Sequence, residues 1–189
     1  FPMALSSLGF FLLLSIDILF LKYYNGDDLV AIYAQPVKII TLIAMIQTTL
    51  QASISKKIAS FYHSRDRDAL ISIISKYTRL IAILSLPFLI LFLLLPKTIL
   101  SFFGPEYTSG SNALLLLLIG TFVNAICGCT NVYMNMTGKQ VAFRNIIFAT
   151  IILNLTLNFI LIPVYGIEGA AIASALSLIF WNLVTVTYV

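Results

Sequence analysis

Charged residues are scarce in this sequence. Only 10% of its 189 residues are Asp, Glu, Lys or Arg, whereas 60% are hydrophobic. A soluble domain has roughly 25% charged residues, because its surface must be hydrated. A soluble protein of this length has too little interior to bury such an apolar surplus. The composition therefore excludes a soluble enzyme and predicts an integral membrane protein.

Residue types that serve catalysis and metal binding are also few. His63 is the only histidine, and no cluster of cysteines or carboxylates accompanies it. Cys127 and Cys129 are the only cysteines, and on a helix they point about 200° from each other, so we expect no shared disulfide or metal. The sequence has no Walker-type loop, HExxH motif or Ser-His-Asp set. We expect no catalytic site, no metal and no cofactor.

Long apolar runs predict transmembrane helices. No charged residue occurs between Glu106 and Lys139, between Arg144 and Glu168, or after Glu168. About 18 apolar residues suffice to cross a bilayer core, and barrel strands are shorter and alternate in polarity. We predict an all-α integral membrane fold with six spans, at about residues 3–23, 29–54, 80–102, 111–136, 143–162 and 167–188.

Basic residues alternate between the two sides of the predicted bundle. Most of them fall in the loops after the second and fourth spans, whereas the opposite side has only Lys22 and Lys97. Cytoplasmic loops are enriched in Lys and Arg, so the first group is predicted to be cytoplasmic, with both chain ends on the same side. This placement explains the net charge of +4 without a nucleic-acid partner. Residues 69–74 are interpreted either as an amphipathic interfacial helix or as the first turns of the third span.

Asp17 and Lys38 are ionisable residues inside predicted spans. Such groups are costly in lipid and usually face the bundle interior or a water-filled cavity. Both lie roughly 9–14 Å below the outer ends of adjacent antiparallel helices, within reach of an ion pair. Two alternatives stay open. In the first, the residues serve structure alone, either as an ion pair or with Lys38 extending to the outer interface. In the second, they take part in binding a substrate or an ion.

Asparagines recur in the fourth and fifth spans. Asn124 and Asn131 belong to the fourth span, and Asn154 and Asn158 lie one turn apart in the fifth. Amide side chains in lipid need partners, so we expect them to face other helices or a cavity. They are interpreted either as interhelical hydrogen-bonding residues or as the polar lining of a substrate path. The small residues of the sixth span, Ser174 among them, are interpreted as packing residues.

An ordered set of motifs extends along the chain. Asp17 and the segment AIYAQPVKI (31–39) are followed by FGPEY (103–107), TGK (137–139), the Asn154–Asn158 pair and LIPVYGIEGAAIA (161–173). This set resembles the carboxy-terminal half of bacterial polysaccharide biosynthesis flippases. These proteins are the O-antigen and capsule exporters of the multidrug/oligosaccharidyl-lipid/polysaccharide superfamily. The resemblance covers nearly the whole chain.

The resemblance implies two six-helix lobes that face a central cavity and move lipid-linked oligosaccharides to the outer leaflet by alternating access. Residues 1–189 correspond to one lobe, so the expected partners are the amino-terminal lobe of the same protein, the lipid-linked substrate and membrane lipids. The expected location is the bacterial cytoplasmic (inner) membrane, where O-antigen for lipopolysaccharide is exported.

In this interpretation Lys38 offsets phosphate charge, and Asp17 is its partner or a site for a coupling H⁺ or Na⁺. Asn124, Asn131, Asn154 and Asn158 would supply hydrogen bonds to the substrate.

Other functions stay open. A multidrug or cation antiporter of the same superfamily needs acidic cavity residues, and a peptidoglycan-precursor flippase is equally close in fold. A membrane-embedded transferase acting on lipid-linked sugars needs acidic or histidine residues near the membrane surface. The outer loops offer Asp27, Asp28, Glu106 and Glu168, without metal-ligand spacing. A purely structural subunit is the remaining class.

Overall fold

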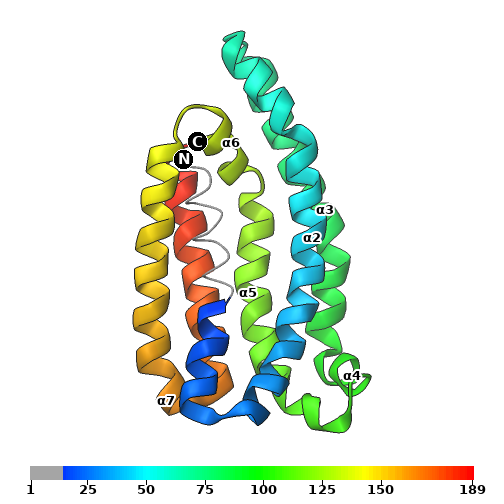
Figure 1. Cartoon of the computed structure of the whole chain (residues 1–189). Helices are drawn as coiled ribbons and strands as arrows, with labels where there is room; N and C mark the ends of the chain where they lie inside the picture. The colour runs from blue at the N-terminus through cyan, green and yellow to red at the C-terminus, as the bar shows by residue number, and fades with distance from the viewer. Residues whose placement is uncertain (1–14) are drawn as a thin grey trace.

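The computed structural model describes residues 15–189, which are nearly all helical. No strand occurs among them, and the predicted all-α fold is confirmed. Figure 1 shows the long helices lying side by side. The described elements are helix 15–25, α2 (Asp27–His63), α3 (Arg67–Leu94), α4 (Pro96–Ser101), the 3₁₀ helix η1 (Pro105–Gly110), α5 (Ser111–Cys127), α6 (Thr130–Met136) and α7 (Gln140–Val186).

Helix α7 turns back on itself at Gly166. This glycine has φ 55° and ψ −126°, outside the helical region, and Pro163 lies just before it. Glycine adopts a positive φ without the steric cost that a Cβ brings. The chain runs to one end of the molecule and returns from it (Figure 1). This break agrees with the turn predicted between the last two spans.

Four described segments are long and apolar enough to cross a bilayer: α2, α3, Pro105–Cys127 and α7. The two arms of α7, residues 140–165 and 167–186, are about 39 and 30 Å long, so each matches a core of about 30 Å. The first predicted span is described only from residue 15 onward, and its residues 3–14 lie outside the described part. The count of six spans therefore stays a prediction.

The predicted loop between the second and third spans is mostly helical. Helix α2 continues to His63, and α3 begins at Arg67 after a tight turn. The Asp66 carboxylate accepts a hydrogen bond from the backbone N–H of Ala69 at 3.0 Å and so caps α3. Residues 69–74 are therefore the first turns of α3, the second of the two alternatives. The α2–α3 tip extends beyond the rest of the molecule (Figure 1).

Two further predicted spans contain breaks in their helices. In the third, α3 ends at Leu94 and Pro96 begins the short helix α4, because proline has no N–H to continue the first helix. In the fourth, Gly128 separates α5 from α6 with φ 59°.

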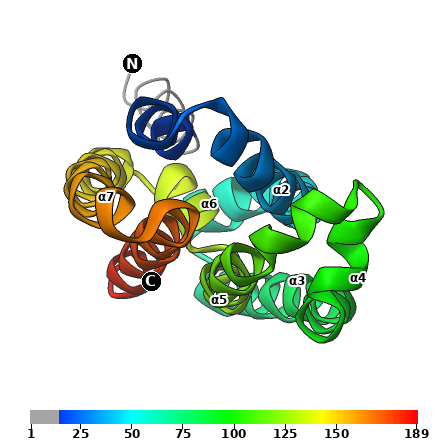
Figure 2. The same cartoon turned by 90° about the horizontal axis from the view of Figure 1, so that it is seen from below.

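Small residues allow α5 and α7 to approach closely. A Cβ added at Gly120 would lie 3.0 Å from the Cα of Ala175, so only glycine fits there without a shift. Ala113 and Ala170 are fully buried, and they pack in one apolar cluster with Leu21. Helix 15–25 lies between α2 and α7 when the molecule is seen along the helices (Figure 2).

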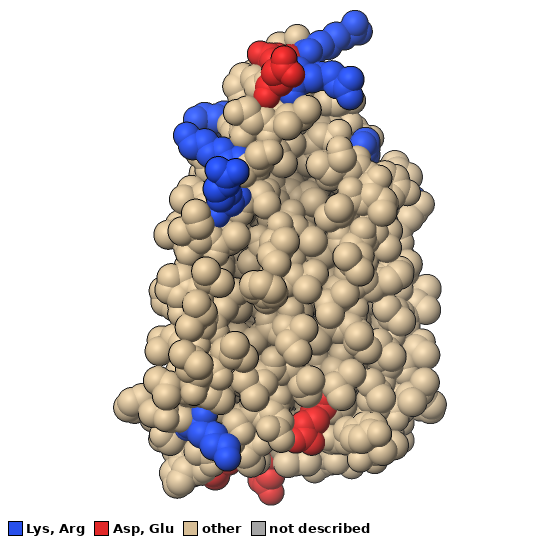
Figure 3. Space-filling model, turned by 180° about the vertical axis from the view of Figure 1, so that it is seen from behind, with Lys and Arg blue, Asp and Glu red and all other residues tan. Residues whose placement is uncertain are grey.

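Charged side chains gather at the two ends of the molecule. Lys and Arg predominate at the end that holds the α2–α3 tip, and a band without charged side chains separates it from the other end on the face in Figure 3. Large apolar side chains such as Ile83, Leu93 and Ile152 are exposed between the two ends. This pattern fits immersion of the middle of the molecule in lipid.

Candidate functional site

Asp17 lies at the centre of a buried polar cluster. Its side chain is only 4% exposed. Tyr33 Oη donates to Asp17 Oδ2 at 2.9 Å, and Asn158 Nδ2 donates to Oδ1 at 2.8 Å. Ser174 Oγ also donates to Oδ2, and Asn158 Nδ2 lies 3.0 Å from Asn154 Oδ1. The cluster therefore joins helix 15–25, α2 and both arms of α7.

The ion pair considered between Asp17 and Lys38 does not form. The ion pair among the described residues is Lys22–Asp27, at 3.0 Å. Lys38 is exposed, and its Nζ lies 3.5 Å from Gln35 Oε1 on the same helix. Tyr33 and Lys38 are five residues apart on α2, which separates their directions by about 140°. Because Tyr33 faces Asp17, Lys38 points away from it.

A cavity of about 150 Å³ adjoins the Asp17 cluster. Helix 15–25, α2, α5 and α7 contribute to its wall, which carries several hydroxyl and amide groups, including those of Thr121, Asn124, Thr150 and Ser177. A polar cavity of this size has room for several water molecules. The cavity connects Asp17 with Gln47 on α2 along the interior of the bundle.

A second polar group joins α2 to α5 and α6. Asn124 Nδ2 donates to Gln47 Oε1 at 2.6 Å, and Asn131 Nδ2 donates to Gln51 Oε1 at 3.1 Å. Gln51 Nε2 donates to the backbone carbonyl of Gly128 at 2.8 Å. That carbonyl belongs to the break between α5 and α6, so Gln51 supplies a partner where the helix is interrupted. Asn124 and Asn131 thus make the interhelical hydrogen bonds of the first alternative.

The predicted site residues fall into three places. Asp17, Asn154 and Asn158 come together, Asn124 and Asn131 lie in the second group, and Lys38 is separate from both.

Sequence reasoning missed four residues that complete these groups. They are Tyr33 and Ser174 beside Asp17, and Gln47 and Gln51 on α2. The two glutamines could have been found, because they lie four residues apart within an apolar run.

Lys38 lies on an exposed, hydroxyl-bearing face of α2. Thr41, Thr48, Thr49 and Ser53 are exposed on the same side of this helix as Lys38. Their hydroxyl groups donate to carbonyls of their own helix, for example Thr41 Oγ1 to Val37 O at 2.8 Å. The oxygen lone pairs on this face remain available as acceptors.

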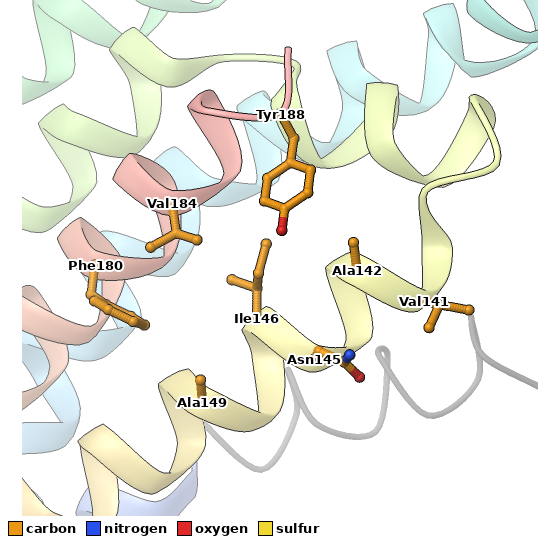
Figure 4. A pocket seen from close by; sticks show the side chains of 8 residues that line it. All are labelled: Val141, Ala142, Asn145, Ile146, Ala149, Phe180, Val184 and Tyr188. Carbon is orange, nitrogen blue, oxygen red and sulfur yellow. The ribbon is translucent and has the colours of Figure 1, made fainter.

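A larger pocket of about 420 Å³ lies between the two arms of α7. Figure 4 shows Phe180, Val184 and Tyr188 on one side of it, with Ile146 on the opposite arm. Apart from Asn145 and the Tyr188 hydroxyl, the described residues that line it are apolar. Its lining offers little for chemistry, so the polar groups above form the candidate site.

Buried polar and ionisable groups inside a multi-helix membrane bundle are typical of membrane transport proteins. The model of the MatE family matches residues 2–160, and the chain belongs to this family. The flippase resemblance seen in the sequence is thereby confirmed at family level.

Two relatives are similar to the chain over most of its length. The chain is 27% identical over 176 residues to "Probable flippase AglR" of Haloferax volcanii, which covers 90% of the chain and 37% of the relative. It is 28% identical over 156 residues to "Putative O-antigen transporter" of Shigella flexneri, covering 82% of the chain and 37% of the relative. The chain thus spans little more than a third of these relatives. No solved structure matches.

Proposed function

We propose that this chain is one lobe of a two-lobe flippase that moves lipid-linked oligosaccharide across the cytoplasmic membrane by alternating access. One relative is named a flippase and the other an O-antigen transporter, and together these names support the flipping of a lipid-linked saccharide. The matched part is 37% of each relative, which leaves enough length for a second lobe of similar size. Both lobes of the full protein would then line the central cavity. In this proposal the protein is a transporter and not an enzyme.

One observation carries the proposal: Lys38 is an exposed cation inside a membrane span without a carboxylate partner among the described residues. It lies about 16 Å along α2 from Asp27 at the helix start. An exposed ammonium group is unfavourable in hydrocarbon but favourable in a water-filled cavity that receives a phosphate. The exposed hydroxyl groups beside Lys38 would meet the sugar hydroxyls of the same substrate.

The charge of the exposed face also favours this substrate class over a drug cation. The ionisable group that α2 exposes within its span is the basic Lys38. The acidic Asp17 is buried and already accepts three side-chain hydrogen bonds. A cationic drug would need the opposite arrangement.

The proposal is tested with the Lys38→Gln variant of the full-length protein. We expect this variant to lose most oligosaccharide translocation in a reconstituted vesicle assay, and Lys38→Arg to retain a larger part of it. The Lys97→Gln variant is the matched control, since Lys97 is exposed beyond the end of α3. Normal translocation by Lys38→Gln would remove Lys38 from the substrate path.

We further propose that Asp17 binds the coupling ion, H⁺ or Na⁺. The Ser174 hydroxyl and the Asn158 amide nitrogen bond to its carboxylate, and the same amide nitrogen bonds to Asn154 Oδ1, so that oxygen-bearing side chains adjoin Asp17. Asn158 Oδ1 is buried and has no hydrogen-bond partner among the described residues, which makes it available to a cation. The test measures translocation under an imposed Na⁺ or pH gradient in wild type and in Asp17→Asn. If the two proteins respond to each gradient in the same way, Asp17 does not bind the coupling ion.

The proposed orientation places the basic end in the cytoplasm, as the enrichment of Lys and Arg in cytoplasmic loops requires. The α2–α3 tip then extends from the inner face of the membrane (Figures 1 and 3). In this orientation Asn124 and Asn131 lie deeper toward the cytoplasm than Lys38, and we propose that they contact the substrate when the lobes reorient. Labelling of single cysteines introduced at residues 64 and 104 with an impermeant reagent, in intact cells and in inverted membrane vesicles, tests the orientation.

A further inference from the structure

A groove of about 620 Å³ lies at the α2–α3 tip, away from Asp17 and Lys38. Arg65 and Arg67 of the tip line it together with Tyr62, and Tyr133 of α6 lines its other side. The side chain of Leu70 is buried beneath it. The groove thus combines cationic, aromatic and apolar surface in one place.

The length of α2 carries this groove past the hydrocarbon core to the surface of the membrane. The helix has 37 residues, from Asp27 to His63. At 1.5 Å per residue it is about 55 Å long, whereas the hydrocarbon core is about 30 Å thick and the whole bilayer about 40–45 Å. The helix is therefore long enough to pass through the core and the headgroup layer, so the groove at its end lies on the water-facing side of the headgroups. Lys and Arg also predominate at this end of the molecule (Figure 3).

The turn that carries Arg65 has an ordered and unusual backbone. Asp66 N–H donates to Phe61 O at 3.1 Å, and Arg65 N–H donates to Tyr62 O at 3.2 Å. These two hydrogen bonds are typical of a helix C-terminus at which the residue after the cap has a left-handed conformation and is usually glycine. Arg65 occupies it instead, with φ 58°, and is the non-glycine residue with positive φ among those described. An arginine held in a costly backbone conformation suggests a role for its side chain.

The arginines of the groove are not neutralised by the acidic residues nearby. Asp66 and Asp68 do not line the groove, and the Asp66 carboxylate caps α3. Arg65 and Arg67 form no ion pair within the described part of the chain. A third cation, Lys139 Nζ, lies 4.9 Å from the ring centre of Tyr133. The groove is therefore complementary to an anion.

We propose that this groove binds the phosphate headgroup of an anionic phospholipid. A guanidinium group can donate two parallel hydrogen bonds to a phosphate, and Arg65 and Arg67 each provide one such group. Tyr62 and Tyr133 have the side chain that is favoured at headgroup depth. Leu70 adds an apolar contact beside the two arginines. The site is independent of the transport proposed above.

The test compares two double variants of the full-length protein in phosphatidylcholine nanodiscs with a minor share of phosphatidylglycerol. Arg65→Gly with Arg67→Gln removes both cations of the groove, and glycine relieves the backbone at residue 65. Lys56→Gln with Lys57→Gln removes the same charge from exposed positions of α2 at the same end, outside the groove. Native mass spectrometry counts the phosphatidylglycerol molecules that stay bound.

We expect the groove variant to bind phosphatidylglycerol about tenfold more weakly and the lysine variant to bind it nearly as wild type does. Equal losses in both variants, or no loss in either, would overturn the site. Displacement of the lipid by millimolar inorganic phosphate would overturn the choice of a lipid over free phosphate. Unfolding midpoints check both variants, and the single Arg67→Gln variant, expected to show a smaller loss, replaces the double variant if that one is unstable.

Discussion

Asp17 and Lys38 are two ionisable residues on neighbouring helices, and the fold treats them in opposite ways. Asp17 is buried and accepts hydrogen bonds from Tyr33, Asn158 and Ser174. Lys38 is exposed, and its hydrogen bond goes to Gln35 on its own helix. Asp17 therefore holds elements together, whereas Lys38 contributes little to the fold and is free for a ligand. A change at Lys38 should therefore impair transport without lowering stability, whereas a change at Asp17 should lower stability in addition to removing the proposed ion site.

The largest effect on stability is expected for Asp17→Leu. The change leaves three donors without an acceptor, of which those of Tyr33 and Asn158 are fully buried, and this should lower the free energy of unfolding by about 3 kcal/mol or more. Thermal unfolding of the full-length protein in detergent measures it. Asp17→Asn keeps the shape and one acceptor oxygen, so its loss should be smaller. An unchanged midpoint for Asp17→Leu would show that the cluster does not hold the helices together.

A smaller loss is expected for Gln51→Leu. The Gly128 carbonyl and the Asn131 amide would both lose their partner, at a cost of about 2 kcal/mol in unfolding free energy. Thr49→Val on the same helix is the control, since Thr49 is exposed and bonds only to the Met45 carbonyl. If both variants unfold at the same temperature, the second polar group is not a structural one.

Tyr33→Phe should cost about 1 kcal/mol, because it removes one of the three donors to Asp17 and keeps the ring. The contribution of the pair is measured by a double-mutant cycle with Asp17→Asn. We expect the loss caused by Tyr33→Phe to shrink in the Asp17→Asn background. Full additivity would mean that Tyr33 stabilises the protein through its packing alone.

The smallest effect on stability is expected for Lys38→Gln. Substitutions at exposed positions usually change the unfolding free energy by less than about 0.5 kcal/mol, and the exposed Lys38–Gln35 hydrogen bond is long, at 3.5 Å. The unfolding midpoint of the full-length variant should therefore equal that of wild type. A large decrease would place Lys38 among the residues that hold the fold, as Asp17 is.

The sequence was sufficient to find both residues but not to pair them. Asp17 and Lys38 stand out because charges are rare in apolar runs, and their depths follow from counting residues along each helix. Depth does not determine the direction of a side chain around its helix, and Tyr33 faces Asp17 where Lys38 was considered. The sequence analysis also ended the second helix too early. The charged residues after residue 54 were interpreted as a loop, whereas α2 continues to His63 because a helix that has left the membrane tolerates charge.

The partners of the asparagines were beyond sequence reasoning for a similar reason. Asn124 and Asn158 are the same residue type within apolar helices, yet Asn124 bonds to Gln47 and Asn158 bonds to Asp17. Which helix lies opposite each amide depends on the tertiary arrangement of α2 and α7. Ser174 was interpreted as a packing residue, and only its position against Asp17 reveals its hydrogen bond.

The most direct test measures unfolding and oligosaccharide translocation together in the full-length protein with Lys38→Gln. Lys38 is exposed and has no carboxylate partner among the described residues, which predicts a protein that folds as wild type does and fails to translocate its substrate. A Lys38→Gln protein that translocates at the wild-type rate would disprove the claim that this residue serves the substrate.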